Sequence, residues 1–85
     1  MHGGTHMRAV EISRQPVELY KILKFEGMVA SGGEAKLVIA DGLVLVNGEV
    51  ETRKRKKIVA GDRIEFDGDV LLIQMAGTDA STTRQ

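Results

Sequence analysis

The sequence contains no cysteine and no tryptophan, and only one proline, one tyrosine and two phenylalanines. Without cysteine, neither a disulfide framework nor a cysteine-ligated zinc site can form. No apolar run approaches the roughly 18 residues that a membrane-spanning helix requires. The start of the chain also lacks the apolar stretch of a secretion signal. We therefore expect a cytoplasmic protein that does not associate with a membrane.

Side chains that carry out catalysis are equally scarce. His2 and His6 are the only histidines, and without a carboxylate or cysteine partner they form a poor metal site. The serines and threonines have no evident base to activate them. Two carboxylate pairs flank expected hairpin turns, where acidic residues are common for structural reasons: Glu49 with Glu51, and Asp67 with Asp69. We expect no catalytic residue, metal, cofactor or small-molecule substrate, and hence no enzyme.

The charged residues are unevenly distributed along the chain. The 85 residues carry 12 Lys and Arg against 12 Asp and Glu, so the formal net charge is zero. Five of the cations are consecutive, at Arg53–Lys57, which leaves seven against the 12 acids of the whole chain. One basic segment on an acidic body would concentrate an anionic partner at one place and repel it elsewhere.

The length fits one domain, and its apolar content of 42% is enough for one core. Residues 1–9 show no hydrophobic period and are expected to be a flexible leader or a tag remnant. Residues 75–85 are small and polar and are expected to form a disordered tail. The folded domain should therefore span residues 10–74.

A first helix is expected over residues 16–26. Pro16 suits the first helical position, and Gly27 is placed to end the helix. Its apolar face would comprise Val17, Leu19, Tyr20, Ile22 and Leu23.

A second helix is expected over residues 32–41. Ser31 stands three residues before Glu34, which is the capping-box spacing, and Gly42 is the expected stop. The inward face would be Ala35, Val38 and Ile39. Lys36 falls on another face, where it is free to meet solvent or a ligand.

Beyond Gly42 the hydrophobic period changes from that of a helix to that of a strand. Asn47-Gly48 and Asp67-Gly68 are strong signals for two-residue hairpin turns. The expected fold is α+β, with two helices packed on a small, mainly antiparallel sheet that begins at about Leu43. The residues expected to be buried include Val38, Ile39, Val44 and Ile64.

The basic segment needs an explanation, because neighbouring like charges repel one another. It lies between two expected strands of one sheet, beside the amino end of the helix that carries Lys36. Gly32 and Gly33, at that helix start, offer backbone donors to a phosphate. The alternative is a charged run that serves solubility alone. The aromatic residues are expected in the core or at its rim, which disfavours base stacking on a sheet: Tyr20, Phe25 and Phe66.

Four short motifs follow one another between residues 19 and 66. They are Leu19, Leu23 and Gly27; Ser31, Ala35, Val38, Ile39 and Gly42; Val44, Val46, Asn47 and Gly48; and Val59, Gly61, Asp62 and Ile64. This pattern resembles the S4 domain, a small α-L motif found in a ribosomal protein, pseudouridine synthases, a tyrosyl-tRNA synthetase and a heat-shock ribosome-binding protein. It is most similar to short stand-alone bacterial S4-like proteins, through Lys24-x-Glu26-Gly27, Ser31-Gly32 and the run from Glu51 to Arg55.

The resemblance implies a module that binds structured RNA, such as ribosomal or transfer RNA, through shape and phosphate contacts. We expect the chain to act as a monomer. The implied RNA-binding residues are Ser31, Gly32, Gly33, Lys36, Arg53, Lys54, Arg55, Lys56 and Lys57. Many S4 domains have basic residues where this chain has Glu18 and Gly32, and Arg53–Arg55 are expected to supply replacement charge. The alternative hypothesis is a protein-interaction adaptor that docks an acidic partner on the basic segment.

Overall fold

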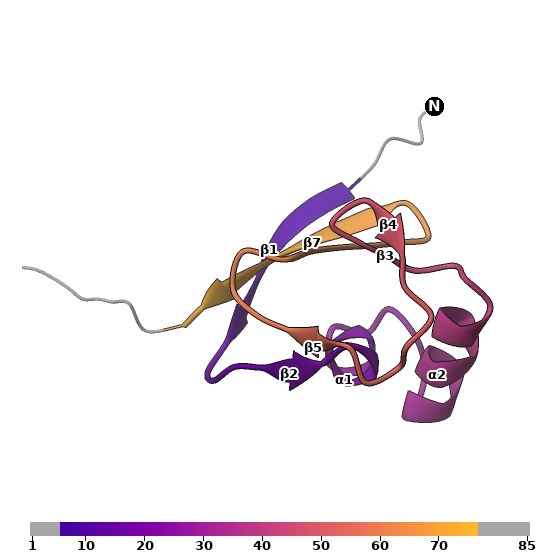
Figure 1. The fold of residues 1–85 in the computed structure, drawn as a ribbon. Helices are drawn as coiled ribbons and strands as arrows, with labels where there is room; N and C mark the ends of the chain where they lie inside the picture. The colour runs from indigo at the N-terminus through magenta and orange to yellow at the C-terminus, as the bar shows by residue number, and fades with distance from the viewer. Residues whose placement is uncertain (1–5, 77–85) are drawn as a thin grey trace, which may run out of the picture.

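The structure is a computed structural model that describes residues 6–76. Its elements, in chain order, are β1 (His6–Ile12), β2 (Val17–Glu18), α1 (Leu19–Phe25), α2 (Gly32–Ala40), β3 (Leu45–Val46), β4 (Glu49–Val50), β5 (Lys57–Ile58), β6 (Arg63–Phe66) and β7 (Asp69–Met75). Figure 1 shows their arrangement.

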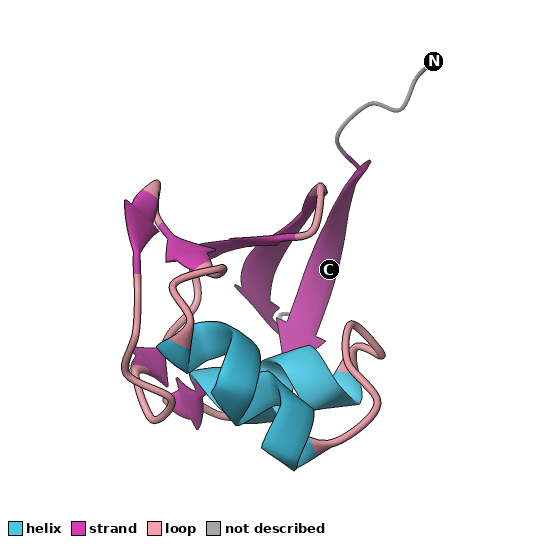
Figure 2. Ribbon diagram, turned by 90° about the vertical axis from the view of Figure 1, so that its right-hand side faces the viewer, coloured by secondary structure: helices cyan, strands magenta, loops and turns pink. Residues whose placement is uncertain are grey.

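Two sheets and two helices make up the described part of the chain. Five strands form one sheet in the order β1-β7-β6-β3-β4, and β2 pairs with β5 in a second, two-stranded sheet. The β1–β7 pair is parallel and the other pairs are antiparallel. Both helices lie on the same side of the five-stranded sheet (Figure 2). The predicted α+β class, with two helices on a mainly antiparallel sheet, is confirmed.

The two predicted hairpin turns are present. Asn47 and Gly48 have φ values of 54° and 86°, and Asp67 and Gly68 have values of 53° and 84°. Two consecutive residues with positive φ are what a type I′ turn requires, and Asn-Gly and Asp-Gly adopt that conformation at low cost. These turns set the register of β3 with β4 and of β6 with β7.

Asn47 also joins two distant segments of the chain. Its Nδ2 donates a hydrogen bond to Asp62 Oδ1 at 3.0 Å, and its Oδ1 accepts one from the Arg63 amide at 2.9 Å. Asp62 Oδ2 in turn accepts a hydrogen bond from the Val59 amide at 2.9 Å. The Asn47-Gly48 and Gly61-Asp62 motifs of the sequence are therefore joined by one hydrogen-bond network.

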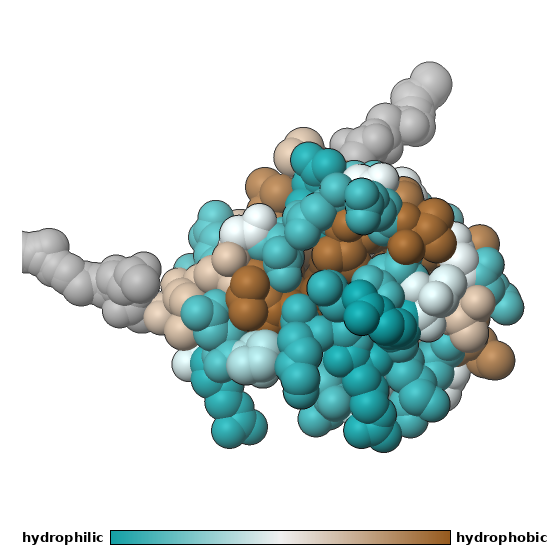
Figure 3. All heavy atoms as spheres, in the orientation of Figure 1, coloured by the Kyte–Doolittle hydropathy of each residue, from teal (hydrophilic) through white to brown (hydrophobic). Residues whose placement is uncertain are grey.

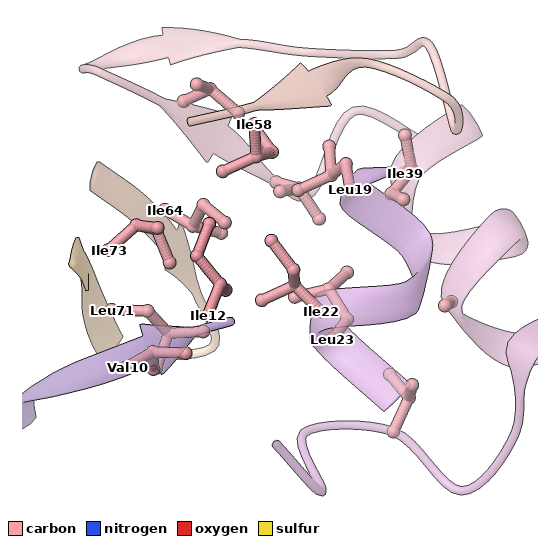
Figure 4. Packing of buried hydrophobic residues seen from close by; sticks show 14 residues of the cluster. Val10, Ile12, Leu19, Ile22, Leu23, Ile39, Ile58, Ile64, Leu71 and Ile73 are labelled. Carbon is pink, nitrogen blue, oxygen red and sulfur yellow. The ribbon is translucent and has the colours of Figure 1, made fainter. Parts of the chain in front are cut away.

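The core fills the space between the five-stranded sheet and the helices (Figure 4). Its buried members are Val10, Ile12, Leu19, Ile22, Leu23, Val29, Ala35, Ile39, Val44, Val46, Ile58, Ile64, Leu71 and Ile73. The predicted burial of Ile39, Val44 and Ile64 is confirmed. The prediction for Val38 is wrong, because Ala35 and Ile39 occupy the centre of the inward face of α2. Val38 is half-buried at its edge.

The helix termini agree with the sequence in part. Ser31 Oγ accepts a hydrogen bond from the Glu34 amide at 3.1 Å, as the capping-box spacing predicts. Gly27 and Gly42 have φ values of 71° and 77°, typical of glycines that end helices. The second helix ends at Ala40, close to the predicted boundary.

The predicted start of the first helix at residue 16 is wrong. Val17 and Glu18 are extended and pair with Ile58 and Lys57 of β5, so α1 begins only at Leu19. This pairing brings the fully buried Ile58 into the core, a long-range gain that outweighs the local preference of the segment for helix.

The predicted leader also needs correction. Residues 6–9 are the first part of β1, which pairs in parallel with β7 from His6 opposite Asp69 to Ile12 opposite Met75. The same pairing places Met75 within β7 and not in a tail. Residues 1–5 and 77–85, the remainder of the predicted leader and tail, lie outside the described part of the chain.

The aromatic residues divide into two groups. Tyr20 and Phe66 are half-buried and pack against the core, as predicted. Phe25 is 69% exposed, contrary to the prediction, because Leu19, Ile22 and Leu23 take up the inward face of α1.

We predict that Ile39→Ala lowers the free energy of unfolding by about 2–5 kcal/mol, because it leaves a cavity at a fully buried site. Leu37→Ala is the matched control, since Leu37 lies on the same helix and is 66% exposed. Its effect should stay within about 0.5 kcal/mol. Denaturant unfolding measures both, and equal losses would contradict the assigned faces of α2.

Candidate functional site

The five consecutive cations, Arg53–Lys57, form a segment that we call the basic loop. It follows β4 of the five-stranded sheet, and its last residue belongs to β5 of the two-stranded sheet. The expectation that it connects two strands of one sheet is therefore wrong, because β5 pairs with β2. The basic loop crosses from the sheet layer to the helix layer.

The backbone of the basic loop is fixed to the amino end of α1. The Leu19 amide donates a hydrogen bond to the Lys56 carbonyl at 2.9 Å, and the Tyr20 amide donates one to the Lys54 carbonyl at 3.1 Å. The first amide groups of a helix have no carbonyl partner within the helix, so these bonds satisfy two of them. The loop is thus attached by its main chain, and these two bonds use none of its side chains.

Two of the five cations already have acidic partners. Arg53 Nε lies 2.9 Å from Glu51 Oε2, and its Nη2 donates to Glu51 Oε1 at 3.1 Å. Arg55 Nη1 lies 3.7 Å from Glu18 Oε2. Within residues 6–76, the other three cations of the loop form no ion pair: Lys54, Lys56 and Lys57. These lysines are the charges that a polyanion could engage without breaking an existing pair.

Lys36 is connected to the basic loop by way of Tyr20, which contacts both. Its Nζ lies 4.8 Å from the centroid of the Tyr20 ring, within the range of a cation–π contact. The Tyr20 amide is bound to the Lys54 carbonyl, so one residue connects Lys36 to the loop. Sequence reasoning placed Tyr20 only on an apolar helix face. No local signal marks a residue whose role depends on how two helices pack.

The amino end of α2 is not directly beside the basic loop. A hollow of about 640 Å³ at the loop is lined by Ala40, Thr52 and the loop itself, so the loop adjoins the carboxyl end of α2. Gly32 lies against the ring of Tyr20, where an added Cβ would be 3.8 Å from Cδ2. Ser31 uses its hydroxyl as the helix cap. Of the predicted residues of α2, Gly32 and Lys36 thus contact Tyr20, and Tyr20 is hydrogen-bonded to the loop.

The amides of Gly32 and Gly33 are the first two of α2 and have no carbonyl partner within the helix. They point to the same end of the helix as the capping Ser31. An added Cβ at Gly33 would meet little besides the Ser31 hydroxyl, so this end of α2 is open.

Hydrophilic side chains cover the surface around the basic loop. Figure 3 shows them over the lower half of this face, where Figure 1 draws the loop between β4 and β5.

Glu18 lies next to the first turn of α1 and contacts Lys21 as well as Arg55. A carboxylate there also interacts favourably with the positive end of the helix dipole.

Two of the four acidic residues considered for catalysis have structural roles. Glu51 is held by Arg53, and Asp67 forms a hairpin turn. Among residues 6–76, no three His, Cys, Asp or Glu side chains are grouped so that they could hold a metal ion. No helix in the same range is long and apolar enough to cross a membrane.

We predict that Glu51 titrates far below an ordinary glutamate. Its pKa is lowered from 4.5 to about 2, chiefly because the Arg53 side chain donates hydrogen bonds to the carboxylate, helped by the Arg53 amide and by the positive charge. Since the folded pKa is the lower one, this pair stabilises the protein above about pH 4.5, and its contribution is lost as the pH falls towards 2. NMR titration of the side-chain carboxyl measures the shift. Arg53→Ala should move the pKa back towards 4.5, and an unchanged value would refute the assignment.

Comparison with known proteins agrees with this geometry. The family model of the S4 domain matches residues 10–74. The chain is 51% identical over 63 residues to YbcJ of Escherichia coli strain K12, covering 73% of this chain and 90% of YbcJ. It is 34% identical over 59 residues to the probable ribosome maturation protein RlbA of Bacillus subtilis strain 168, covering 69% and 83% of the two chains.

The structure is also similar to a solved one. The solution structure of YbcJ from E. coli, described as revealing an α-L motif involved in RNA-binding, matches with a TM-score of 0.63 and 44% identity. The match covers 87% of this chain and 95% of that one. These matches point to the same family as the motifs between residues 19 and 66 and the arrangement of two helices on the sheet. The protein belongs to the S4 domain family.

Proposed function

We propose that the protein binds structured RNA, ribosomal or transfer RNA, as a non-catalytic cytoplasmic monomer. The observation that carries this proposal is the basic loop, in which three lysines without an acidic partner in residues 6–76 stand on a backbone fixed to α1. A rigid support lowers the entropy that the loop would otherwise lose on binding.

The relatives support RNA over other polyanions. The YbcJ structure is described in terms of RNA-binding, and RlbA is named for ribosome maturation. The matches cover 90% of YbcJ and 83% of RlbA, so nearly the whole of each relative corresponds to this chain. Ribosomal RNA is accordingly the class of ligand that we favour.

The chemistry of the proposed surface favours contacts to phosphates. Lysines interact with phosphates as point charges, and such contacts hold a nucleic acid in position without selecting its sequence. Lys36 and the open end of α2 at Gly32 and Gly33 extend the surface beyond the loop. A surface of this kind recognises the backbone shape of folded RNA more than its bases.

We predict that affinity for a structured RNA falls with salt, with a log–log slope of about −2 to −4, as expected when about three to five phosphates are neutralised. Lys54→Glu should weaken binding to RNAs of different sequence alike and make the slope shallower. Filter binding or fluorescence anisotropy between about 50 and 200 mM salt measures both effects.

Arg63→Glu is the control, because it changes the net charge equally at an exposed site on β6, outside the proposed surface. It should leave RNA affinity close to that of the parent protein. Both variants should keep a melting midpoint close to that of the parent protein, since exposed charges, and exposed ion pairs such as Arg63–Glu65, contribute little to folding. Parent-like RNA binding by Lys54→Glu would reject the loop as an RNA contact and favour the adaptor hypothesis.

A further inference from the structure

Phe25 is the last residue of α1 and is 69% exposed. It adds nothing to the core, which receives Leu19, Ile22 and Leu23 from the same helix. Single exposed apolar residues are common on protein surfaces, so exposure alone has no functional meaning. The residues around Phe25 point to a function for its exposed ring.

Phe25 lines a groove of about 690 Å³ between α1, the end of β1 and the connection from β1 to β2. This volume lies within the range of small-ligand sites, about 300–1,000 Å³. Tyr20 lines the same groove, so two of the three aromatic residues of the chain border it.

The charges of the groove suit a nucleotide. Arg14 and Lys24 line it, and neither forms an ion pair within residues 6–76. Two of its carboxylates are already engaged, Glu18 by Lys21 and Arg55, and Glu26 by Arg8. The remaining free carboxylate of the lining, Glu11, would repel a phosphate but can accept hydrogen bonds from the edge of a base.

The groove shares Tyr20 and Gly32 with the proposed RNA surface. Gly32, at the open end of α2, lines the groove and lies against Tyr20. Tyr20 also contacts Lys36 and is bound to the backbone of the basic loop at Lys54. Tyr20 therefore lies between the basic loop and the groove that Phe25 lines.

We propose that this groove receives an unpaired base of the bound RNA, which stacks on Phe25 while Arg14 and Lys24 contact the flanking phosphates. The proposal rests on the RNA-binding function proposed above and adds that the target contains a single-stranded loop or bulge. Stacking on an aromatic ring accepts any base, since every base has a π-face. Bases inside a duplex cannot reach the ring, so the groove distinguishes looped RNA from continuous duplex.

The absence of tryptophan makes a direct test possible, because Phe25→Trp introduces a unique fluorophore. The probes are an RNA hairpin with a mixed-sequence loop and a blunt duplex with the sequence of its stem. We expect the hairpin to quench the tryptophan at position 25 and the duplex to leave it unchanged. Leu43→Trp, at another exposed apolar site outside the groove, should respond to neither RNA.

Binding assays test the energetic side of the proposal. Phe25→Ala and Phe25→Leu should each lose about 10-fold in affinity for the hairpin and nothing for the duplex, while Phe25→Trp keeps the parent affinity. Parent-like hairpin binding by Phe25→Leu would show that an apolar side chain suffices, as at a protein-docking surface, and would overturn base stacking. Equal losses on both RNAs would overturn it as well.

The two proposals fail in different ways. If the parent protein binds hairpin and duplex equally and Lys54→Glu weakens both, the stacking proposal is wrong and the RNA-binding function stands. If the parent protein binds neither RNA at low salt, the RNA-binding function itself is wrong.

Discussion

The attachment of the basic loop to the amino end of α1 is the constraint on which the candidate site depends. Two main-chain hydrogen bonds, from Leu19 to Lys56 and from Tyr20 to Lys54, hold a segment whose side chains repel one another. The pairing of β5 with β2 and the burial of Ile58 fix the end of that segment. Each hydrogen bond contributes only about 1 kcal/mol net, but together they orient the loop without consuming its lysines. The same two bonds place Tyr20 between the loop, Lys36 and the groove that holds Phe25.

Much of the fold was predictable because its determinants are local. The positive φ values at Asn47-Gly48 belong to a two-residue turn that the sequence itself specifies. The cap formed by Ser31 and Glu34 needs only four consecutive residues, and Gly27 ends α1 through its own backbone freedom. The basic run and Lys36 can be identified in the sequence from composition and from helical spacing, and their contact with RNA stays a prediction.

The remainder depends on contacts between distant parts of the chain. The strand His6–Ile12 has little hydrophobic period of its own and is extended because β7 lies beside it. Val17 and Glu18 are likewise extended, and not helical as expected, because they pair with β5. The bridging position of Tyr20 and the exposure of Phe25 follow from how α1 packs on α2 and on the sheet. The helical period correctly placed Leu19, Ile22 and Leu23 on the inward face of α1, but it does not show which other apolar residues the neighbouring elements cover.

We propose above that RNA binds along a surface that runs from the basic loop over Tyr20. Amide chemical-shift mapping by NMR, with a structured RNA added to the labelled protein, tests this most directly. Shifts are expected at the loop, Tyr20, Lys36 and Gly32. Leu72 of β7, which alternates with the buried Leu71 and Ile73 and so lies on the other face of the sheet, should be unaffected. Shifts confined to the sheet, with the loop and Tyr20 unchanged, would contradict it.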